Sequence, residues 1–185
     1  MVFVLFIFNR EKEVRLTKFN FRGNKNFQVL EVKDINMIRI VVGNIVDSNE
    51  TYICHQVNCQ NAMGAGVAKA LYEKWPLVKS EYHEFCGKHC APVELLGAHQ
   101  LVSIGDDKWV INIFGQLEFG RNKNKVYTDY VALEKVFAAI SQLDGSFAFP
   151  FGIGCGLANG DWNIVYSLIE KYFSDKDVVL YSFLK

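Results

Sequence analysis

The sequence predicts an α/β domain in which helices cover both faces of a mostly parallel sheet. Three observations predict this class: strand-like and helix-like segments alternate from Ile38 onward, a glycine-rich stretch joins strand to helix at two places, and half of the 185 residues are hydrophobic. A chain of this size and composition can close a substantial core without disulfides or metals. In such folds ligands bind at the carboxyl ends of the strands.

Short apolar runs bounded by turn residues predict the strands. The expected strands are 38–42, 51–57, 98–104, 108–114, 146–150 and 177–183. Gly105, Asp106 and Asp107 lie between the third and fourth of them and favour a tight turn, so we expect a hairpin there.

Four segments are typical of helices: 66–75, 77–85, 128–142 and 161–173. Pro76 separates the first two, because proline opens a helix far better than it sits within one. In the third, Leu133, Phe137 and Ile140 share one face, and Thr128 is the expected amino-terminal cap.

We expect residues 37–185 to form the domain and residues 1–36 to be an extension. The first eight residues are apolar, but they are too few to span a membrane and lack a basic leader or cleavage site. Alternation at Val14, Leu16 and then Phe19, Phe21 suggests strands or a hairpin. Translation starting at Met37 is the alternative interpretation.

Composition limits the classes of partner. Lysine plus arginine equals aspartate plus glutamate at 20 each, so no global basic field exists to gather a nucleic-acid backbone. Five cysteines are an odd number outside a loop-rich framework, which favours reduced thiols in a cytoplasmic protein. His83, Cys86, His89 and Cys90 do not have an established zinc spacing. We therefore expect a cytoplasmic monomer without metal, cofactor, membrane contact or sequence-specific nucleic-acid partner.

The first glycine stretch lies in QVNCQNAMGAGVAKAL (56–71), where Gly64, Ala65 and Gly66 precede a helix. Unpaired amides at a helix amino terminus bind anions, and glycines let a phosphate approach them. The stretch is no Walker loop, and Lys69 occupies the third small position of the dinucleotide fingerprint. Taken alone, the stretch also fits a close-packed turn.

The second glycine stretch lies in FPFGIGCGLANGDW (149–162) and again joins a strand to a helix. Two such loops can converge at one sheet edge and hold a diphosphate between them. The alternative is that Gly152, Gly154 and Gly156 serve sharp turns, with Asn159 or Asp161 capping the last helix.

Five motifs in this order resemble the macrodomain family over residues 38–185. They are VGNIV (42–46), HQVNCQNAMGAGVAKAL (55–71), WVINIFGQ (109–116), YTDYVAL (127–133) and PFGIGCGL with GDW (150–162). The chain is most similar to the branch of yeast-type ADP-ribose 1″-phosphate phosphatases, terminal ADP-ribose protein glycohydrolases and their phage and bacterial relatives. The resemblance implies a three-layer α/β/α sandwich with a mixed, mostly parallel central sheet and ADP-ribose in a surface cleft.

The resemblance also implies the site residues. Asn44, followed by Ile45, falls where most macrodomains place an aspartate that contacts the adenine amino group, and its carbonyl can accept the same hydrogen bond. Asn58 falls where an asparagine meets the distal ribose. The first diphosphate loop matches Gly64, Ala65, Gly66 and Val67, and the second matches Gly152, Ile153, Gly154, Cys155, Gly156 and Leu157.

The catalytic residues of the glycohydrolases are missing, because Gly115 or Gln116 replaces their lysine and Ala158 their aspartate. His55, Asn58 and Asp161 remain as candidate catalytic residues, with Gln116 and Asp129 further away. His55 matches a histidine of the phosphatase branch and could act as general acid or base, oriented by Asp161, or it could be a core histidine bonded to a backbone carbonyl.

Two classes of function are open at this point. In the first, the protein is a hydrolase that removes phosphate from ADP-ribose 1″-phosphate, or an ADP-ribosyl group from a modified macromolecule or from O-acetyl-ADP-ribose. In the second, it is a non-catalytic module that binds free or attached ADP-ribose, which the missing lysine and aspartate also permit.

Overall fold

The computed structural model describes residues 6–9, 12–15, 33–35 and 38–183. The chain divides into two compact units, residues 1–37 and residues 38–185. In the first, β1 (Phe6–Asn9), β2 (Lys12–Arg15) and β3 (Lys33–Ile35) form an antiparallel sheet. Val14 lies in β2, whereas Leu16, Phe19 and Phe21 lie outside the described residues.

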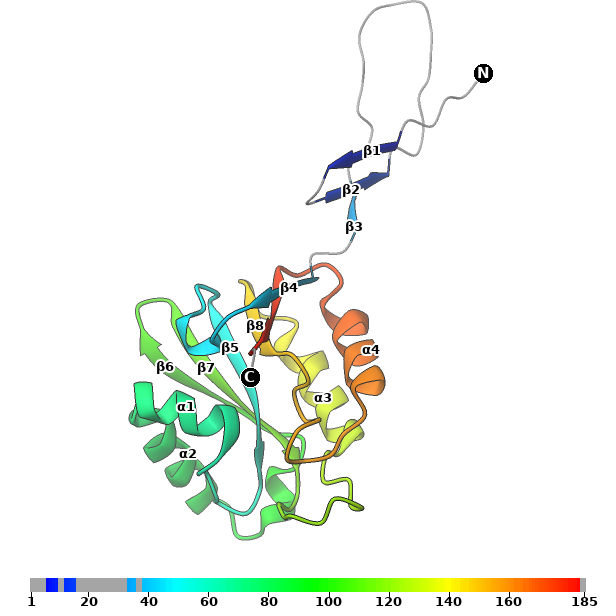
Figure 1. Cartoon of the computed structure of the whole chain (residues 1–185). Helices are drawn as coiled ribbons and strands as arrows, with labels where there is room; N and C mark the ends of the chain where they lie inside the picture. The colour runs from blue at the N-terminus through cyan, green and yellow to red at the C-terminus, as the bar shows by residue number, and fades with distance from the viewer. Residues whose placement is uncertain (1–5, 10–11, 16–32, 36–37, 184–185) are drawn as a thin grey trace, which may run out of the picture. The chain divides into compact units, whose positions relative to one another are not determined.

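A six-stranded sheet forms the centre of the second unit, in the order β4-β9-β8-β5-β7-β6 (Figure 1). Its strands are β4 (Ile38–Val42), β5 (Tyr52–Asn58), β6 (His99–Gly105), β7 (Lys108–Gln116), β8 (Phe147–Pro150) and β9 (Val178–Ser182). All neighbours pair in parallel except β6 and β7, which form the predicted hairpin. The sheet is therefore mixed and mostly parallel, which confirms the predicted fold class.

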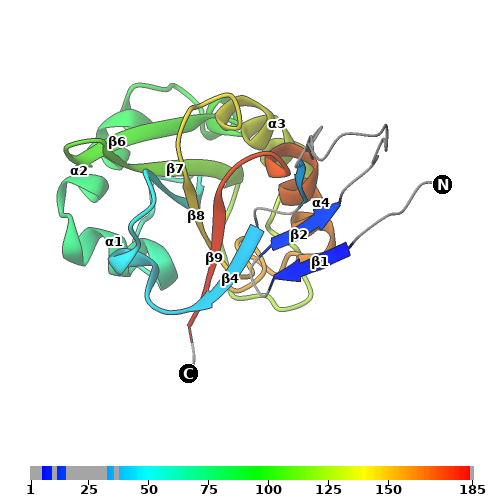
Figure 2. The same cartoon turned by 90° about the horizontal axis from the view of Figure 1, so that it is seen from above.

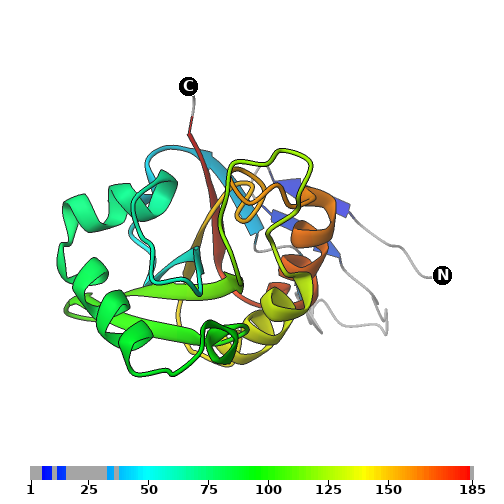
Figure 3. The same ribbon diagram turned by 90° about the horizontal axis from the view of Figure 1, so that it is seen from below.

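Two pairs of helices cover the sheet, one pair on each face (Figures 1, 2 and 3). The helices α1 (Gly66–Lys74) and α2 (Leu77–Gly87) cover one face, and α3 (Tyr130–Ile140) and α4 (Trp162–Phe173) cover the other. Two short 3-10 helices, η1 (Ile45–Asp47) and η2 (Pro92–Leu95), complete the unit. The result is a three-layer sandwich with a hydrophobic core on each side of the sheet.

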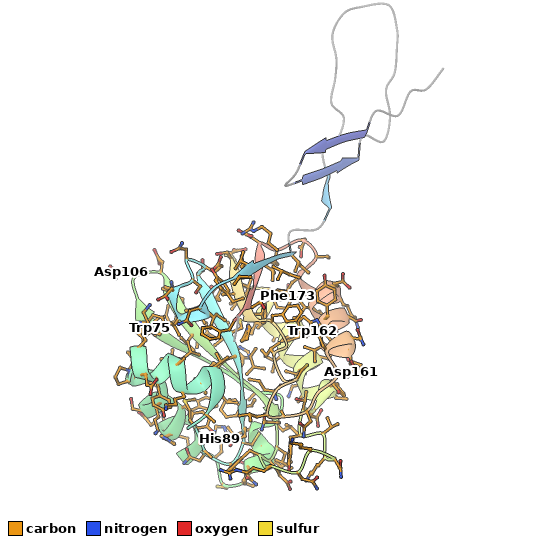
Figure 4. All side chains as sticks on the ribbon, in the orientation of Figure 1. Trp75, His89, Asp106, Asp161, Trp162 and Phe173 are labelled. Atoms are coloured by element: carbon orange, nitrogen blue, oxygen red, sulfur yellow. The ribbon has the colours of Figure 1, made fainter. Side chains whose placement is uncertain are left out.

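Successive side chains along each strand point to opposite faces of the sheet, so the strands contribute to both cores. On β5, Cys54 packs into the core beneath α3 and α4, whereas Ile53 and Val57 pack into the core beneath α1 and α2. Phe173 of α4 is fully buried against the sheet (Figure 4). His55 therefore points to the same face as Ile53 and Val57, the face that α1 and α2 cover.

The cap of α3 differs from the predicted one. Asp129, and not Thr128, is the cap, since its carboxylate accepts a hydrogen bond from the backbone N–H of Ala132 at 2.9 Å. The Thr128 hydroxyl instead donates to the carbonyl of Gly154 at 2.6 Å. The helix starts two residues later than expected because Thr128 pairs with Gln116 in an isolated β-bridge.

None of the described helices is both long and apolar enough to cross a membrane. The described cysteines, Cys54, Cys59, Cys86, Cys90 and Cys155, all carry free thiols.

Candidate ligand-binding cleft

A cleft of about 850 Å³ lies where β5, β7 and β8 reach their carboxyl ends. These strands run in parallel, so the loops that follow them meet at one edge of the sheet. Its lining comes from 55–58, 62–68, 116, 119–121, 150–154 and 156–158. The two glycine stretches, far apart in sequence, are thus brought together in one cleft.

The first glycine stretch leads into an uncapped helix. Gly66 opens α1 with a φ of +58°, and Ala65 at the cap position has no side chain to bond the first turn. Within the described part of the chain, no acceptor bonds the backbone N–H groups of Gly66, Val67 or Ala68. By contrast, carboxylates cap α3 and α4. The first turn of α1 therefore presents unpaired amides, which attract an anion.

The second glycine stretch presents further unpaired amides. Gly152 and Gly154 have φ values of +77° and +75°, a region that favours glycine. The N–H groups of Gly152, Gly154 and Gly156 find no acceptor among residues 38–183. Successive turns here leave these donors available to a ligand, as in other backbone anion sites.

Hydrogen bonds between polar side chains hold the second glycine stretch in place. The side-chain amide of Gln56 donates to the side-chain oxygen Oε1 of Gln116 at 2.8 Å and to the Thr128 hydroxyl at 3.1 Å. Thr128 in turn donates to the Gly154 carbonyl. A Cβ on Gly154 would lie 2.6 Å from Gln56 Oε1, and the φ of +75° would strain any other residue, so both favour glycine at this position.

Asn58 lines the cleft and braces the first loop. Its side-chain amide donates to the Ala62 carbonyl at 2.6 Å, and its Oδ1 accepts from the N–H of Gln60 at 2.9 Å. The buried Tyr82 hydroxyl donates to the Asn58 carbonyl at 2.9 Å. These contacts fix the course of the chain between β5 and α1.

His55 lines the cleft but is only 1% exposed. Its Nε2 lies 2.5 Å from Asn112 Oδ1, while Asn112 donates from Nδ2 to Gln100 Oε1 at 2.9 Å. Gln100 donates on to the Glu81 carbonyl at 2.9 Å. Because Asn112 uses its donor on Gln100, it accepts from His55, and the proton of the neutral imidazole sits on Nε2.

Burial keeps this imidazole neutral. It lowers the pKa of His55 from 6.5 to about 4, although the hydrogen bond with Asn112 opposes the shift. Nδ1 of His55 is buried and has no partner among the described residues. At neutral pH His55 therefore offers a lone pair at Nδ1, and it carries no proton there to donate.

Three predicted residues lie outside the lining. Asp161 caps α4 by accepting from the N–H of Asn163 at 2.8 Å (Figure 4). Asn44 caps η1 through a bond from the N–H of Val46 at 3.4 Å, and Ile45 is 6% exposed in the core. Asn44 follows β4, which runs parallel to β9, so it lies at the same sheet edge as the cleft but beyond the strands that line it.

Cys155 is also absent from the lining, although its neighbours in the second glycine stretch belong to it. Its thiol donates to the Ile153 carbonyl at 3.3 Å. Burial, followed by the nearby charge of Asp161, raises the pKa of Cys155 to about 11, so the thiol stays protonated at neutral pH.

The sequence cluster at His83, Cys86, His89 and Cys90 does not converge. His83 Nδ1 bonds to Asn61 Oδ1 at 2.5 Å, and His89 Nδ1 bonds to the Phe85 carbonyl at 2.9 Å. Among the residues that the structure describes, no three His, Cys, Asp or Glu side chains are grouped so that they could hold a metal ion.

Comparison with known proteins decides the fold. No family model matches the sequence, and no curated protein matches it either. Solved structures do match: the macrodomain of Mycobacterium tuberculosis DarG has a TM-score of 0.65 at 22% identity over 79% of this chain and 97% of that one. A macrodomain protein from Streptomyces coelicolor has a TM-score of 0.64 at 23% identity, over 80% of this chain and 99% of that one.

The chain has the macrodomain fold. Thermosipho africanus DarTG, solved in complex with ADP-ribose, matches with a TM-score of 0.64 at 19% identity, over 83% of this chain and 44% of that chain. The motifs quoted from the sequence thus predicted the fold correctly, with the two glycine loops at one end of its sheet.

Sequence reasoning missed one wall of the cleft in this macrodomain fold. Phe119, Gly120 and Arg121 line it from the loop between β7 and α3. This loop has no hydrophobic periodicity and no glycine run. Arg121 is the only charged residue in the described lining once His55 is neutral.

Proposed function

We propose that the protein binds ADP-ribose, or a derivative of it, in this cleft. The observation that carries the proposal is the pair of unpaired amide sets, one from the first turn of α1 and one from the second glycine stretch. Two such sets facing one space suit a diphosphate, whose charge is spread over several oxygens. The described lining contains no aspartate or glutamate that would repel a diphosphate.

The size of the cleft supports the same ligand class. A volume of about 850 Å³ is in the range that holds a nucleotide-sized molecule. The Thermosipho structure of the same fold contains ADP-ribose. In this proposal the adenosine extends towards Asn44 and Ile45, and the distal ribose lies near His55 and Asn58.

Within this function, we propose hydrolysis of ADP-ribose 1″-phosphate as the activity. Loop amides and Arg121 suit the charge of a phosphate monoester, whose transfer needs mainly positioning and charge stabilisation. The structure suggests how His55 would contribute. Nδ1 is unprotonated but buried, so it can accept a hydrogen bond from a ribose hydroxyl or from the attacking water only where the ligand displaces the atoms that cover it.

One observation favours a non-catalytic ADP-ribose reader as the second candidate. A histidine whose pKa is about 4 is a weak base, and the carboxylate of Asp161 caps α4 by accepting a hydrogen bond. Only His55 of the two lines the cleft, and it is a weak base there. Removal of an ADP-ribosyl group from a macromolecule, or of acetate from O-acetyl-ADP-ribose, remains the third outcome to test.

A single preparation of the full chain tests these candidates. ADP-ribose should raise the melting temperature in the millimolar range, and AMP, which lacks the diphosphate, should raise it much less. Phosphate release from ADP-ribose 1″-phosphate then identifies the phosphatase. Stabilisation by ADP-ribose without release of phosphate, ADP-ribose or acetate from the three substrates identifies the reader. Absence of any thermal shift would remove both.

A further inference from the structure

The loop between β7 and α3 contributes a positively charged side chain, Arg121, to the lining of the cleft. Arg121 lines the cleft and makes no ion pair with any described residue. In the same loop, Lys125 is paired with Glu118 at 2.5 Å, and Lys123 lies outside the lining. The guanidinium of Arg121 is therefore the charge of this loop that is available to a ligand.

The backbone on both sides of Arg121 is anchored. Gly120 packs so closely on Tyr127 that a Cβ would lie 2.1 Å from the tyrosine hydroxyl oxygen. The side-chain amide of Asn159 donates to the carbonyls of Asn122 at 3.1 Å and Lys125 at 2.8 Å. Asn159 belongs to the segment that follows the second glycine stretch, so the Arg121 loop is tied to the amides of the proposed diphosphate site.

Strand order places Arg121 at one end of the site. The amide sets follow β5 and β8, β7 lies on the side of β5 away from β8, and β4 is the far edge strand. Arg121 follows β7, whereas Asn44 follows β4. If the diphosphate lies between the amide sets and the adenosine extends towards Asn44, Arg121 faces the opposite end of the ligand.

We propose that Arg121 is a specificity residue that binds an anionic phosphate attached to the distal ribose. This inference rests on the proposed ADP-ribose site and names the substrate class that the site prefers. A planar guanidinium can bind two phosphate oxygens at once, and it stays charged at every pH of interest. The cleft thereby discriminates ADP-ribose with a terminal phosphate from ADP-ribose without one.

The test compares two ligands on the full chain. The probes are ADP-ribose and its 1″-methylenephosphonate, whose carbon–phosphorus bond is not hydrolysed. The unmodified protein should bind the phosphonate about tenfold more tightly than ADP-ribose, and less so as salt is added. Arg121→Met should abolish this preference and leave the affinity for ADP-ribose within about threefold. Lys123→Met, in the same loop but outside the lining, should keep the preference for the phosphonate.

A second variant tests the anchoring. Asn159 has a φ of +55°, which glycine also adopts, so Asn159→Gly removes the two side-chain bonds without straining the backbone. Asn159→Gly should reduce the preference for the phosphonate, although Arg121 itself is not substituted, because the loop that carries Arg121 loses its anchor.

The outcomes separate the two proposals. If ADP-ribose binds but Arg121→Met keeps the preference, or lowers the affinity for both ligands equally, the inference is wrong while the ADP-ribose site stands. If the unmodified protein binds ADP-ribose without preferring the phosphonate, the inference is wrong as well. If neither ligand binds the unmodified protein, the proposed function itself fails.

Discussion

The imidazole of His55 is bonded on one side only. Nε2 lies 2.5 Å from Asn112 Oδ1, whereas Nδ1 is buried without a partner among the described residues. The chain of bonds through Asn112 and Gln100 to the Glu81 carbonyl fixes the tautomer. This relationship leaves His55 neutral, with a buried acceptor at Nδ1, and leads to two predictions.

The first concerns stability. Burial lowers the pKa of His55 from 6.5 in the unfolded chain to about 4 in the folded one, so the unfolded state binds more protons between these values. We expect the free energy of unfolding to fall by about 3 kcal/mol at most as the pH drops through this window. Urea unfolding between about pH 7 and pH 4 measures the fall.

His55→Gln is the matched variant for this measurement, because a glutamine amide can still donate to Asn112 but does not titrate. The pH dependence of its stability should be flatter than that of the unmodified protein. Half-buried His99, whose pKa burial also lowers, acts in the same direction in both proteins and cancels in the comparison. Equal slopes would show that His55 is not buried in the neutral form.

The second prediction concerns turnover of ADP-ribose 1″-phosphate. If His55 only accepts a hydrogen bond, the rate should not change with its ionisation between about pH 5.5 and pH 8. His55→Ala should lower kcat by about tenfold to a hundredfold, and the affinity for ADP-ribose much less. A pH–rate limb near pH 6 to 7 that disappears in His55→Gln would contradict this role and identify a titrating acid or base.

Gly156 offers the cleanest block of the proposed diphosphate site. A Cβ there meets no atom within 4 Å, and its φ is not in the left-handed region. Gly156→Glu should therefore fold normally and lower the affinity for ADP-ribose by about a hundredfold, because it adds a negative charge beside the loop amides.

Gly87→Glu is the control for this block, since a Cβ at Gly87 is equally free and the residue lies at the end of α2, outside the lining. Gly154→Val is unsuitable, because its Cβ would meet Gln56 and its φ of +75° would strain valine. Normal binding by folded Gly156→Glu would move the diphosphate elsewhere.

Asp161 can be tested for capping and chemistry separately. Asparagine caps a helix as well as aspartate does, whereas alanine does not, so Asp161→Ala should cost about 1 kcal/mol of stability and Asp161→Asn little. If capping is the whole role, both variants should keep turnover. Loss of turnover in Asp161→Asn, with stability unchanged, would assign the carboxylate to the reaction.

The sequence predicted the elements well because their signals are local. Apolar runs, Pro76 and the glycine stretches mark strand and helix ends, and the structure has those ends within about two residues. The cap of α3 was wrong for a non-local reason. Thr128 and Asp129 are both good caps, and contacts with Gln116 and Gly154, distant in sequence, decide between them.

The parts of the site that consist of backbone amides could be predicted from the sequence. The parts that depend on the positions of side chains could not. Glycines before a helix indicate available amides from sequence alone. The partner of His55, Asn112, lies 57 residues further along the chain, and its burial arises from the fold, so its lowered pKa has no local signal. The place of Arg121 depends on Asn159, which lies 37 residues beyond Asn122 and holds its carbonyl.

A calorimetric titration of the full chain with ADP-ribose at neutral pH tests whether the cleft binds this ligand. We expect one ADP-ribose to bind per chain, with a single ligand bridging both amide sets, AMP binding much more weakly and Gly156→Glu binding ADP-ribose about a hundredfold more weakly. A flat titration at millimolar ADP-ribose, or equal affinity for ADP-ribose and AMP, would contradict it.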